Sequence, residues 1–134
     1  MRTAVIVDDS PIVRIQLRQI LERIGAKVVA EGASGDQVAA LYAQHKPDLI
    51  TLDIVMPGKD GVTAAIDLLR EHPEARIVMC TSLTTRDKIL ACQKAGVCHY
   101  VLKPFDPRRV EQVFQFAFEH GSRAPVAAAP GVTA

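Results

Sequence analysis

The chain has 134 residues, the length of one domain, and 49% of them are hydrophobic, so a single buried core is expected. Its 16 lysines and arginines nearly balance its 15 acids, which excludes nucleic acid or a membrane surface as a partner held by overall charge. The sequence has no apolar run of the roughly 18 residues that a spanning helix needs, and its start, MRTAVIVDDS, carries acids where a signal peptide has its apolar segment.

Five short apolar runs alternate along the chain with five segments of helical periodicity. This alternation is typical of an α/β fold in which a parallel sheet carries helices on both faces. The strands are expected at residues 3–7, 27–31, 48–52, 75–80 and 98–102.

Residues suited to helix ends bound each helical pattern, with a cap residue before the first turn and glycine or proline after the last. The opening residues are Ser10, Ser34, Gly61, Thr84 and Asp106, and the residues at the far ends are Gly25, Pro47, Pro73 and Gly96. In the last helix, Phe116 falls off the centre of the apolar face. We expect it either to be exposed for contact with a partner or to be covered by the tail or a neighbouring helix.

The composition changes at Ser122 to SRAPVAAAPGVTA, whose small residues and prolines predict a flexible tail or a truncated linker. We therefore expect one domain over residues 1–121, followed by residues 122–134. Three irregularly spaced cysteines do not match a zinc site, and reduced thiols are typical of a cytoplasmic protein.

Polar residues follow the apolar runs at the ends where the strands of a parallel sheet finish. Asp8-Asp9 follow the first run, Asp53 the third, Thr81-Ser82 the fourth and Lys103-Pro104 the fifth. Ligands bind at this edge of such sheets. Carboxylates within about 4 Å repel by roughly 4 kcal/mol per pair at an effective dielectric of 20, so a cation is needed to offset the cost. An all-oxygen cluster suits Mg²⁺, for which Mn²⁺ can substitute.

With these motifs in view, the chain resembles the receiver domains of two-component response regulators over residues 1 to about 120. The motifs that carry the resemblance are VDDS, LDIVMPGKDG, CTS and YVLKPF. The resemblance implies a flavodoxin-like, doubly wound, five-stranded parallel sheet of order 2-1-3-4-5 with five helices in three layers.

The resemblance also implies the chemistry of the site. Asp53 would accept a phosphoryl group from the phosphohistidine of a sensor histidine kinase or a phosphotransfer protein. Asp9, Asp53 and the backbone carbonyl of Val55 would ligate Mg²⁺, and Asp8 would act through water. The chain would thus catalyse its own phosphorylation and dephosphorylation without being an enzyme that turns over a substrate.

Further site residues come from the same resemblance. Thr81, Ser82 and Lys103 would bind phosphoryl oxygens, and the bond before Pro104 would be cis. Thr81 and Tyr100 would form the switch that alters the surface of the fourth helix, fifth strand and fifth helix. That surface would bind a downstream target, or pair two chains in a weak dimer of an otherwise monomeric protein.

Two positions depart from the polar residues that often flank the phosphoryl group in this family. Val55 lies two residues after Asp53, and Leu83 lies two residues after Thr81. Because neither side chain can orient an attacking water, we expect the aspartyl phosphate to decay slowly.

Other functions fit the sequence less well. An aspartate-nucleophile phosphohydrolase needs a second acid two residues after the nucleophile, where this chain has Val55. A flavodoxin-like cofactor binder needs anion donors after its first strand, where Asp8-Asp9 would repel an anion. A receiver that only docks partners would not need the three acids, the hydroxyl and the lysine of the site, namely Asp8, Asp9, Asp53, Thr81 and Lys103. What stays open is whether the chain acts alone, as in chemotaxis or a phosphorelay, or is a fragment of a regulator with an output domain.

Overall fold

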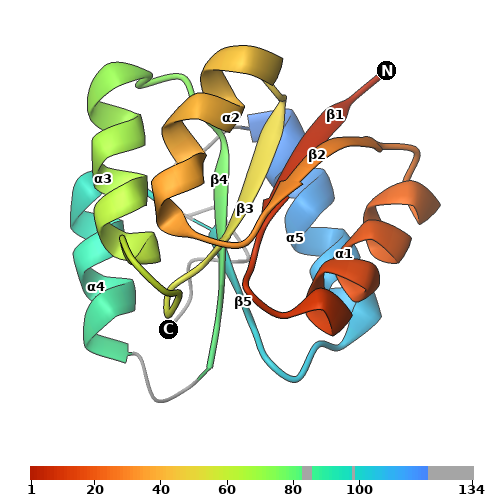
Figure 1. The fold of residues 1–134 in the computed structure, drawn as a ribbon. Coiled ribbons are helices and arrows are strands. Elements are labelled where there is room, and N and C mark those ends of the chain that lie inside the picture. Colours follow the sequence, from red (N-terminus) through yellow and green to blue (C-terminus); the bar gives the residue numbers. More distant parts are fainter. Residues whose placement is uncertain (83–85, 98, 121–134) are drawn as a thin grey trace.

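In a computed structural model of the protein, residues 1–82, 86–97 and 99–120 are described (Figure 1). Five parallel strands form one sheet in the order β2-β1-β3-β4-β5. The strands are β1 (Thr3–Val7), β2 (Lys27–Gly32), β3 (Leu49–Asp53), β4 (Ile77–Thr81) and β5 (His99–Leu102). The predicted fold class and strand order are confirmed.

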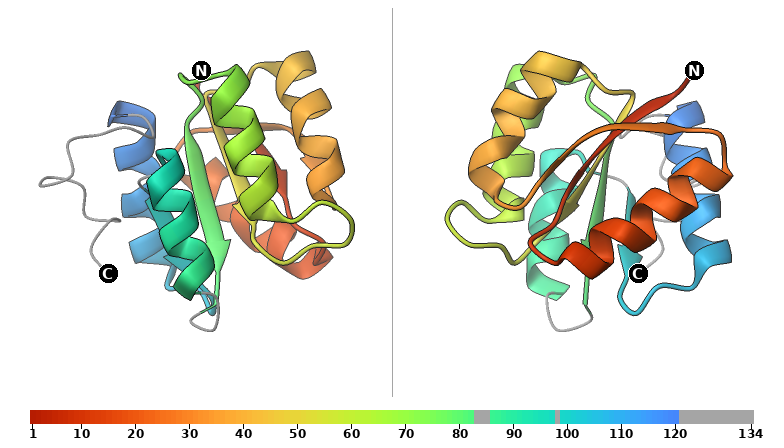
Figure 2. Two further views of the ribbon diagram at one scale, coloured as in Figure 1. Left: turned by 90° about the vertical axis from the view of Figure 1, so that its left-hand side faces the viewer. Right: turned by 45° about the vertical axis from the view of Figure 1, so that its right-hand side comes forward.

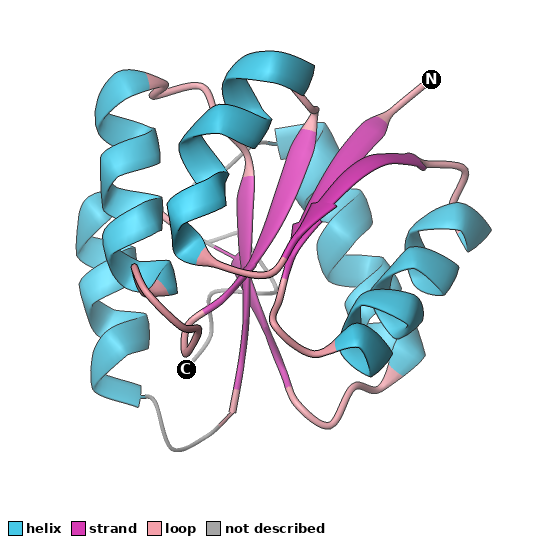
Figure 3. Ribbon diagram, in the orientation of Figure 1, coloured by secondary structure: helices cyan, strands magenta, loops and turns pink. Residues whose placement is uncertain are grey.

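Helices cover both faces of the sheet, which gives the predicted three layers (Figures 2 and 3). One apolar core lies between the sheet and α1 and α5, and the other lies between the sheet and α2, α3 and α4. The helices are α1 (Pro11–Arg23), α2 (Val38–His45), α3 (Gly61–Glu71), α4 (Arg86–Ala95) and α5 (Pro107–His120), with a 3-10 turn, η1 (Gly35–Gln37), before α2.

The helix starts predicted at Ser10, Gly61 and Asp106 agree with the structure, whereas the one predicted at Ser34 does not. Val13 N donates to the hydroxyl of Ser10 at the start of α1, and Thr63 N donates to the carboxylate of Asp60 at the start of α3. Ser34, expected to open the second helix, caps η1 instead, and α2 begins only at Val38. Thr84, the expected cap of the fourth helix, lies outside the described residues.

β2, β3 and β4 each end one residue later than predicted, and in β3 and β4 the added residue is one of the predicted site residues. β3 begins one residue later than expected and ends on Asp53, which pairs in register with Cys80 of β4. β4 likewise reaches Thr81, which pairs with Leu102 of β5. All five residues of both strands are buried. The backbone that carries Asp53 is therefore fixed by neighbours on both sides and by both cores.

Phe116 is half-buried, which is intermediate between the exposed and the covered positions expected for it. Its ring packs against the ring of the buried His99 on β5, with centroids 5.6 Å apart, and against that of His120, with centroids 4.2 Å apart. The strand and the helix's own last turn thus cover part of the side chain, and the tail lies outside the described residues.

Candidate functional site

The carboxyl ends of four strands bring the predicted site residues to one edge of the sheet. Asp8 follows β1 and continues its pairing, because its N–H donates to the carbonyl of Gly32 at 3.0 Å. Lys103 follows β5 in the same way, with its N–H 2.7 Å from the carbonyl of Thr81. Asp53 is itself the last residue of β3. These backbone hydrogen bonds fix the positions of the Cα atoms that carry the polar side chains.

Three carboxylates form one cluster at this edge. Asp8, Asp9 and Asp53 each offer an oxygen, and these three oxygens lie within 4.8 Å of one another. Asp8 and Asp53 are buried, whereas Asp9 is exposed. Burial and the charge of Asp8 raise the pKa of the Asp53 carboxyl above its ordinary value, although Lys103 and the Val55 N–H work in the opposite direction. The cluster therefore holds negative charge that its surroundings do not fully stabilise.

Lys103 supplies the positive charge closest to these acids. Its Nζ lies 3.1 Å from Oδ2 of Asp8 and 3.3 Å from Oδ2 of Asp53. Burial opposes the charge on Lys103, but the hydrogen bond and charge of Asp8, together with Asp53, outweigh it and raise the pKa of the ammonium. Three carboxylates and one ammonium leave two negative charges. Two remaining negative charges and a set of ligands that are all oxygen atoms fit a divalent cation such as Mg²⁺.

The loop after β3 turns away from the sheet through two glycines. Gly58 has a φ of +71°, a conformation that other residues adopt only with strain. Gly61 donates its N–H to the carbonyl of Ile54 at 2.8 Å, and a Cβ at Gly61 would lie 1.9 Å from the carbonyl oxygen of Asp53. The start of α3 therefore packs directly on the backbone of Asp53. Within the loop, the Val55 side chain is 57% exposed.

Thr81 ends β4 and Ser82 follows it, whereas Tyr100 lies inside β5, where it pairs with Met79. Thr81 is buried, and its hydroxyl donates to the carbonyl of Ser82 at 3.3 Å. Tyr100 is half-buried against the core that α2, α3 and α4 cover. The peptide bond between Lys103 and Pro104 is cis. Leu83, expected to flank the phosphoryl group, lies outside the described residues.

The residue that holds the Asp8 backbone in place could not be identified from the sequence motifs. Arg14 of α1 donates from Nη1 to the Asp8 carbonyl at 2.6 Å and pairs through Nε with Glu31 of β2 at 3.0 Å. Asp8 also accepts from the N–H of Ser10 at 2.9 Å. An arginine one turn into the helix that follows the acids was the available signal, but its partner on β2 is visible only in three dimensions.

Three comparisons with known proteins agree with one another. The sequence profile described as "Response regulator receiver domain" matches residues 4–115. The chain is 38% identical to the chemotaxis protein CheY of Bacillus subtilis over 105 residues, which cover 78% of this chain and 88% of that protein. It is 33% identical over 120 residues to the protein CcdB of the same organism, covering 90% of this chain and all of that protein.

Solved structures show the same likeness. The crystal structure of the CheX-CheY-BeF3-Mg²⁺ complex from Borrelia burgdorferi contains a chain that is 30% identical, with a TM-score of 0.82 and coverage of 87% of this chain and 89% of that one. A LuxR-family two-component response regulator from Aurantimonas is 32% identical, with a TM-score of 0.82 and coverage of 95% and 93%. Among the described residues, no helix is long and apolar enough to cross a membrane.

Proposed function

The chain belongs to the response regulator receiver domain family, and from this premise we propose that it is a phosphorylation switch whose phosphoacceptor is Asp53. One observation carries the proposal: the Asp53 carboxylate ends a fully buried strand, 3.3 Å from a lysine ammonium and within a cluster of three acids. A nucleophile held rigidly beside groups that neutralise phosphoryl charge is what phosphoryl transfer requires.

In the proposed reaction, an oxygen of the Asp53 carboxylate attacks the phosphorus of a phosphohistidine on a sensor kinase or phosphotransfer protein. The new bond is oxygen to phosphorus, the phosphorus–nitrogen bond breaks, and the imidazole leaves with the bonding electrons. Asp53 must be ionised to react. Lys103 supports the ionised form because its ammonium lies beside the carboxylate.

Mg²⁺ would be held by Asp9, Asp53 and the Val55 carbonyl, with Asp8 acting through water. When bound, it neutralises the charge that gathers on the phosphoryl oxygens. The oxygen cluster and its two uncompensated charges support this assignment. The similarity to a CheY chain in a complex with BeF3 and Mg²⁺ supports it as well.

Lys103, Thr81 and Ser82 would bind the phosphoryl oxygens. Lys103 would exchange its contact with Asp53 for one with the phosphoryl group and keep its contact with Asp8, which holds the ammonium at the site. The Thr81 hydroxyl, which donates to the adjacent Ser82 carbonyl, would turn toward the new phosphate. Tyr100 would then follow into the space that Thr81 leaves.

Exposed apolar side chains beside the site fit the docking of partners. Ile12 and Ile15 on α1 are 69% and 57% exposed, and α1 begins two residues after Asp9. This face is suited to the kinase or phosphotransfer protein. Leu90 on α4 and Leu102 on β5 are exposed as well, on the surface that Thr81 and Tyr100 would change. That surface would bind a target protein or a second chain, with Phe116 at its margin on α5.

The biological setting is proposed from the family. We assign residues 1–121 to the receiver and residues 122–134 to a tail, and we favour a receiver that acts alone in chemotaxis or a phosphorelay over a fragment of a larger regulator. A cytoplasmic location fits the thiols of Cys80 and Cys92, which are free and buried. Burial raises the pKa of the Cys92 thiol to about 11, so it stays protonated and unreactive at neutral pH.

Phosphotransfer from purified candidate kinases tests the proposal. Radioactive phosphate should move to the wild-type chain in the presence of Mg²⁺ and should not move to Asp53→Asn. Asp87→Asn makes the same chemical change at an exposed position of α4 and should accept label normally. Label that persisted on Asp53→Asn would overturn the assignment of the phosphoacceptor.

A further inference from the structure

The turn before α2 and the loop after β3 interlock, although 23 residues separate Ser34 from Pro57. A Cβ on Gly35 would lie 1.9 Å from the carbonyl oxygen of Lys59, so only glycine allows the two backbones to approach this closely. A Cβ on Gly58 would lie 2.2 Å from Oδ2 of Asp36. Each segment therefore has a glycine at the position where the other segment contacts it most closely.

Hydrogen bonds join the same two segments. The hydroxyl of Ser34 lies 3.0 Å from the carbonyl oxygen of Pro57 and can donate to it, and the N–H of Lys59 donates to the Asp36 carboxylate at 3.2 Å. Ser34 Oγ and Asp36 Oδ2 are 3.1 Å apart, and the one hydroxyl proton of Ser34 can be donated either to this carboxylate or to the Pro57 carbonyl. We call this arrangement of Ser34 and Asp36 on Pro57 and Lys59 the loop latch.

The latched loop is the one that would hold the metal. It starts directly after Asp53, contains Val55 and leads into α3 at Gly61. β3 fixes its beginning, and the bond from Gly61 N to the Ile54 carbonyl fixes its end. The loop latch holds the middle, at Pro57 and Lys59. A carbonyl ligand is effective only when the backbone that carries it is held in the productive position.

We propose that Ser34 and Asp36 are positioning residues for the metal site, which set the affinity for Mg²⁺ by holding the loop that carries the Val55 carbonyl. The inference rests on the proposed function, since it assigns a role relative to that Mg²⁺ site. Neither residue belongs to the acid cluster, and neither was singled out by the sequence motifs of the site. Their effect is transmitted through the backbone of Pro57 and Lys59.

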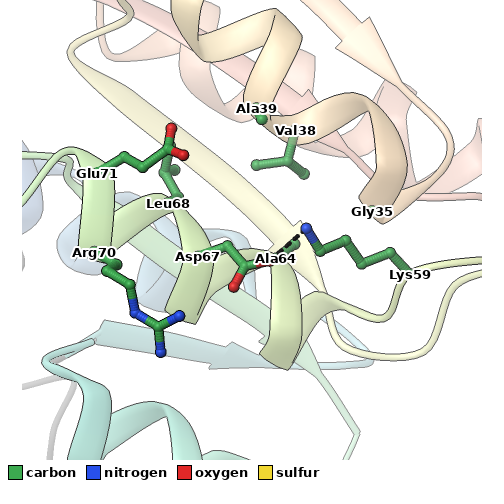
Figure 4. Close-up of a pocket in the computed structure, with 9 residues that line it drawn as sticks. All are labelled: Gly35, Val38, Ala39, Lys59, Ala64, Asp67, Leu68, Arg70 and Glu71. Atoms are coloured by element: carbon green, nitrogen blue, oxygen red, sulfur yellow. Dashed lines mark ion pairs between the residues drawn. The ribbon is translucent and has the colours of Figure 1, made fainter.

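The same loop makes a second contact, which serves as the comparison for the loop latch. The side chain of Lys59 pairs with Asp67 of α3, and both residues line a pocket between α2 and α3 (Figure 4). Asp36 is exposed as well, so the two contacts differ in what they hold: this pair joins two side chains that are 30% and 43% exposed, whereas the loop latch bonds the backbone of Pro57 and Lys59. Exposed ion pairs contribute little. The pair should therefore not position the Val55 carbonyl.

Isothermal titration with Mg²⁺ of the whole chain and its variants tests the inference. Asp36→Ala removes the acceptor for Lys59 N and should weaken Mg²⁺ binding about tenfold, at the lower end of the losses seen when outer partners of metal ligands are removed. Asp67→Ala removes the same charge next to the same loop and should stay within about twofold of wild type, because exposed pairs contribute little. Asp36→Asn keeps an acceptor oxygen and should restore most of the affinity.

Rescue by Asp36→Asn separates positioning from simple loss of charge, because Asn carries no charge. Ser34→Ala gives a second reading if Asp36→Ala fails to fold, and it should weaken Mg²⁺ binding by removing the donor to the Pro57 carbonyl. Folded Asp36→Ala or Ser34→Ala with wild-type affinity would overturn the inference. Wild-type protein that bound no Mg²⁺ would instead overturn the proposed metal site, so the two failures are distinguishable.

Discussion

The ammonium of Lys103 lies 3.1 Å from the carboxylate of Asp8, although β3 and β4 separate the two strands that carry these residues. The lysine side chain therefore crosses the edge of the sheet and passes Asp53 on the way. One cation serves two buried acids, which makes Lys103 a structural counterion before any phosphate is present.

Replacing Lys103 with Met should destabilise the metal-free protein by about 1–3 kcal/mol, because the buried Asp8 and Asp53 carboxylates lose their cation. Urea unfolding without Mg²⁺ measures this. Lys94→Met, at an exposed position of α4, is the control and should change the free energy of unfolding by less than about 0.5 kcal/mol. Equal stability of the two variants would contradict the counterion role.

Asp53→Asn should stabilise the metal-free protein at neutral pH. The folded-state pKa of Asp53 is raised above the unfolded value of 3.8 by burial and by Asp8, so the folded state binds this proton more tightly than the unfolded state. Ionised Asp53 therefore destabilises the folded protein at pH values above its folded-state pKa. This destabilisation disappears as the pH falls through the folded-state pKa toward the unfolded-state pKa. Melting curves without Mg²⁺ should show the variant melting higher at neutral pH, with the gap closing toward acid pH. A lower midpoint for the variant at neutral pH would contradict this account.

Mg²⁺ should raise the melting temperature of the wild-type protein, because it binds the folded acid cluster and has no comparable site on the unfolded chain. The gain is about 2.7 kcal/mol when free Mg²⁺ is about 100 times its Kd. About 1 kcal/mol shifts the midpoint of a domain of this size by roughly 4 °C. Sodium chloride at the same ionic strength is the control. If Mg²⁺ shifted the midpoint no more than sodium chloride, the acid cluster would not be a metal site.

The edge residues could be predicted from the sequence because each follows an apolar run, and parallel strands present their carboxyl ends together. The placement of Asp8, Asp53 and Lys103 at this edge could be predicted without knowing any distance between them. The contacts that support them depend on segments that meet only in the folded chain. Arg14 forms an ion pair with Glu31 on the neighbouring strand, and no periodicity in the sequence predicts that pair.

Helix periodicity separates the buried apolar residues of α1 from the exposed ones. Leu17, Ile20 and Leu21 are buried, whereas Ile12 and Ile15 are exposed. At 100° per residue Ile12 and Ile15 lie on the side of the helix away from this buried face, while Val13 of the first turn packs against the core. The difference in burial could therefore be predicted from the sequence, although the partner that an exposed apolar face contacts could not.

Gly61→Ala should displace the backbone of Asp53, because the added Cβ would lie 1.9 Å from the Asp53 carbonyl oxygen. We expect a loss of about 1–3 kcal/mol in stability, the usual cost of forcing atoms into a packed site, together with weaker Mg²⁺ binding. Gly25→Ala is the matched control. Gly25 has a φ of +86° with nothing within 4 Å of its Cβ position, so that variant is strained in its backbone but remote from the site. It should lose stability and keep wild-type Mg²⁺ affinity. Equal Mg²⁺ affinities for the two variants would show that Gly61 does not support Asp53.

Val55 should prolong the life of the aspartyl phosphate. Its N–H is directed to the Asp53 carboxylate, and the residue is 57% exposed. An apolar side chain there cannot orient or deprotonate that water. Val55→Glu or Val55→Asn, alone or with the same change at Leu83, should therefore speed hydrolysis about tenfold or more, a modest share of what positioned acid–base groups contribute. Decay of labelled phosphate in a purified sample with no kinase measures the rate, and Ala43→Asn on the exposed face of α2 should leave it unchanged. If the polar variants decayed no faster than wild type, the lifetime would be set elsewhere, and the apolar residue at position 55 would have to be explained by contact with a partner.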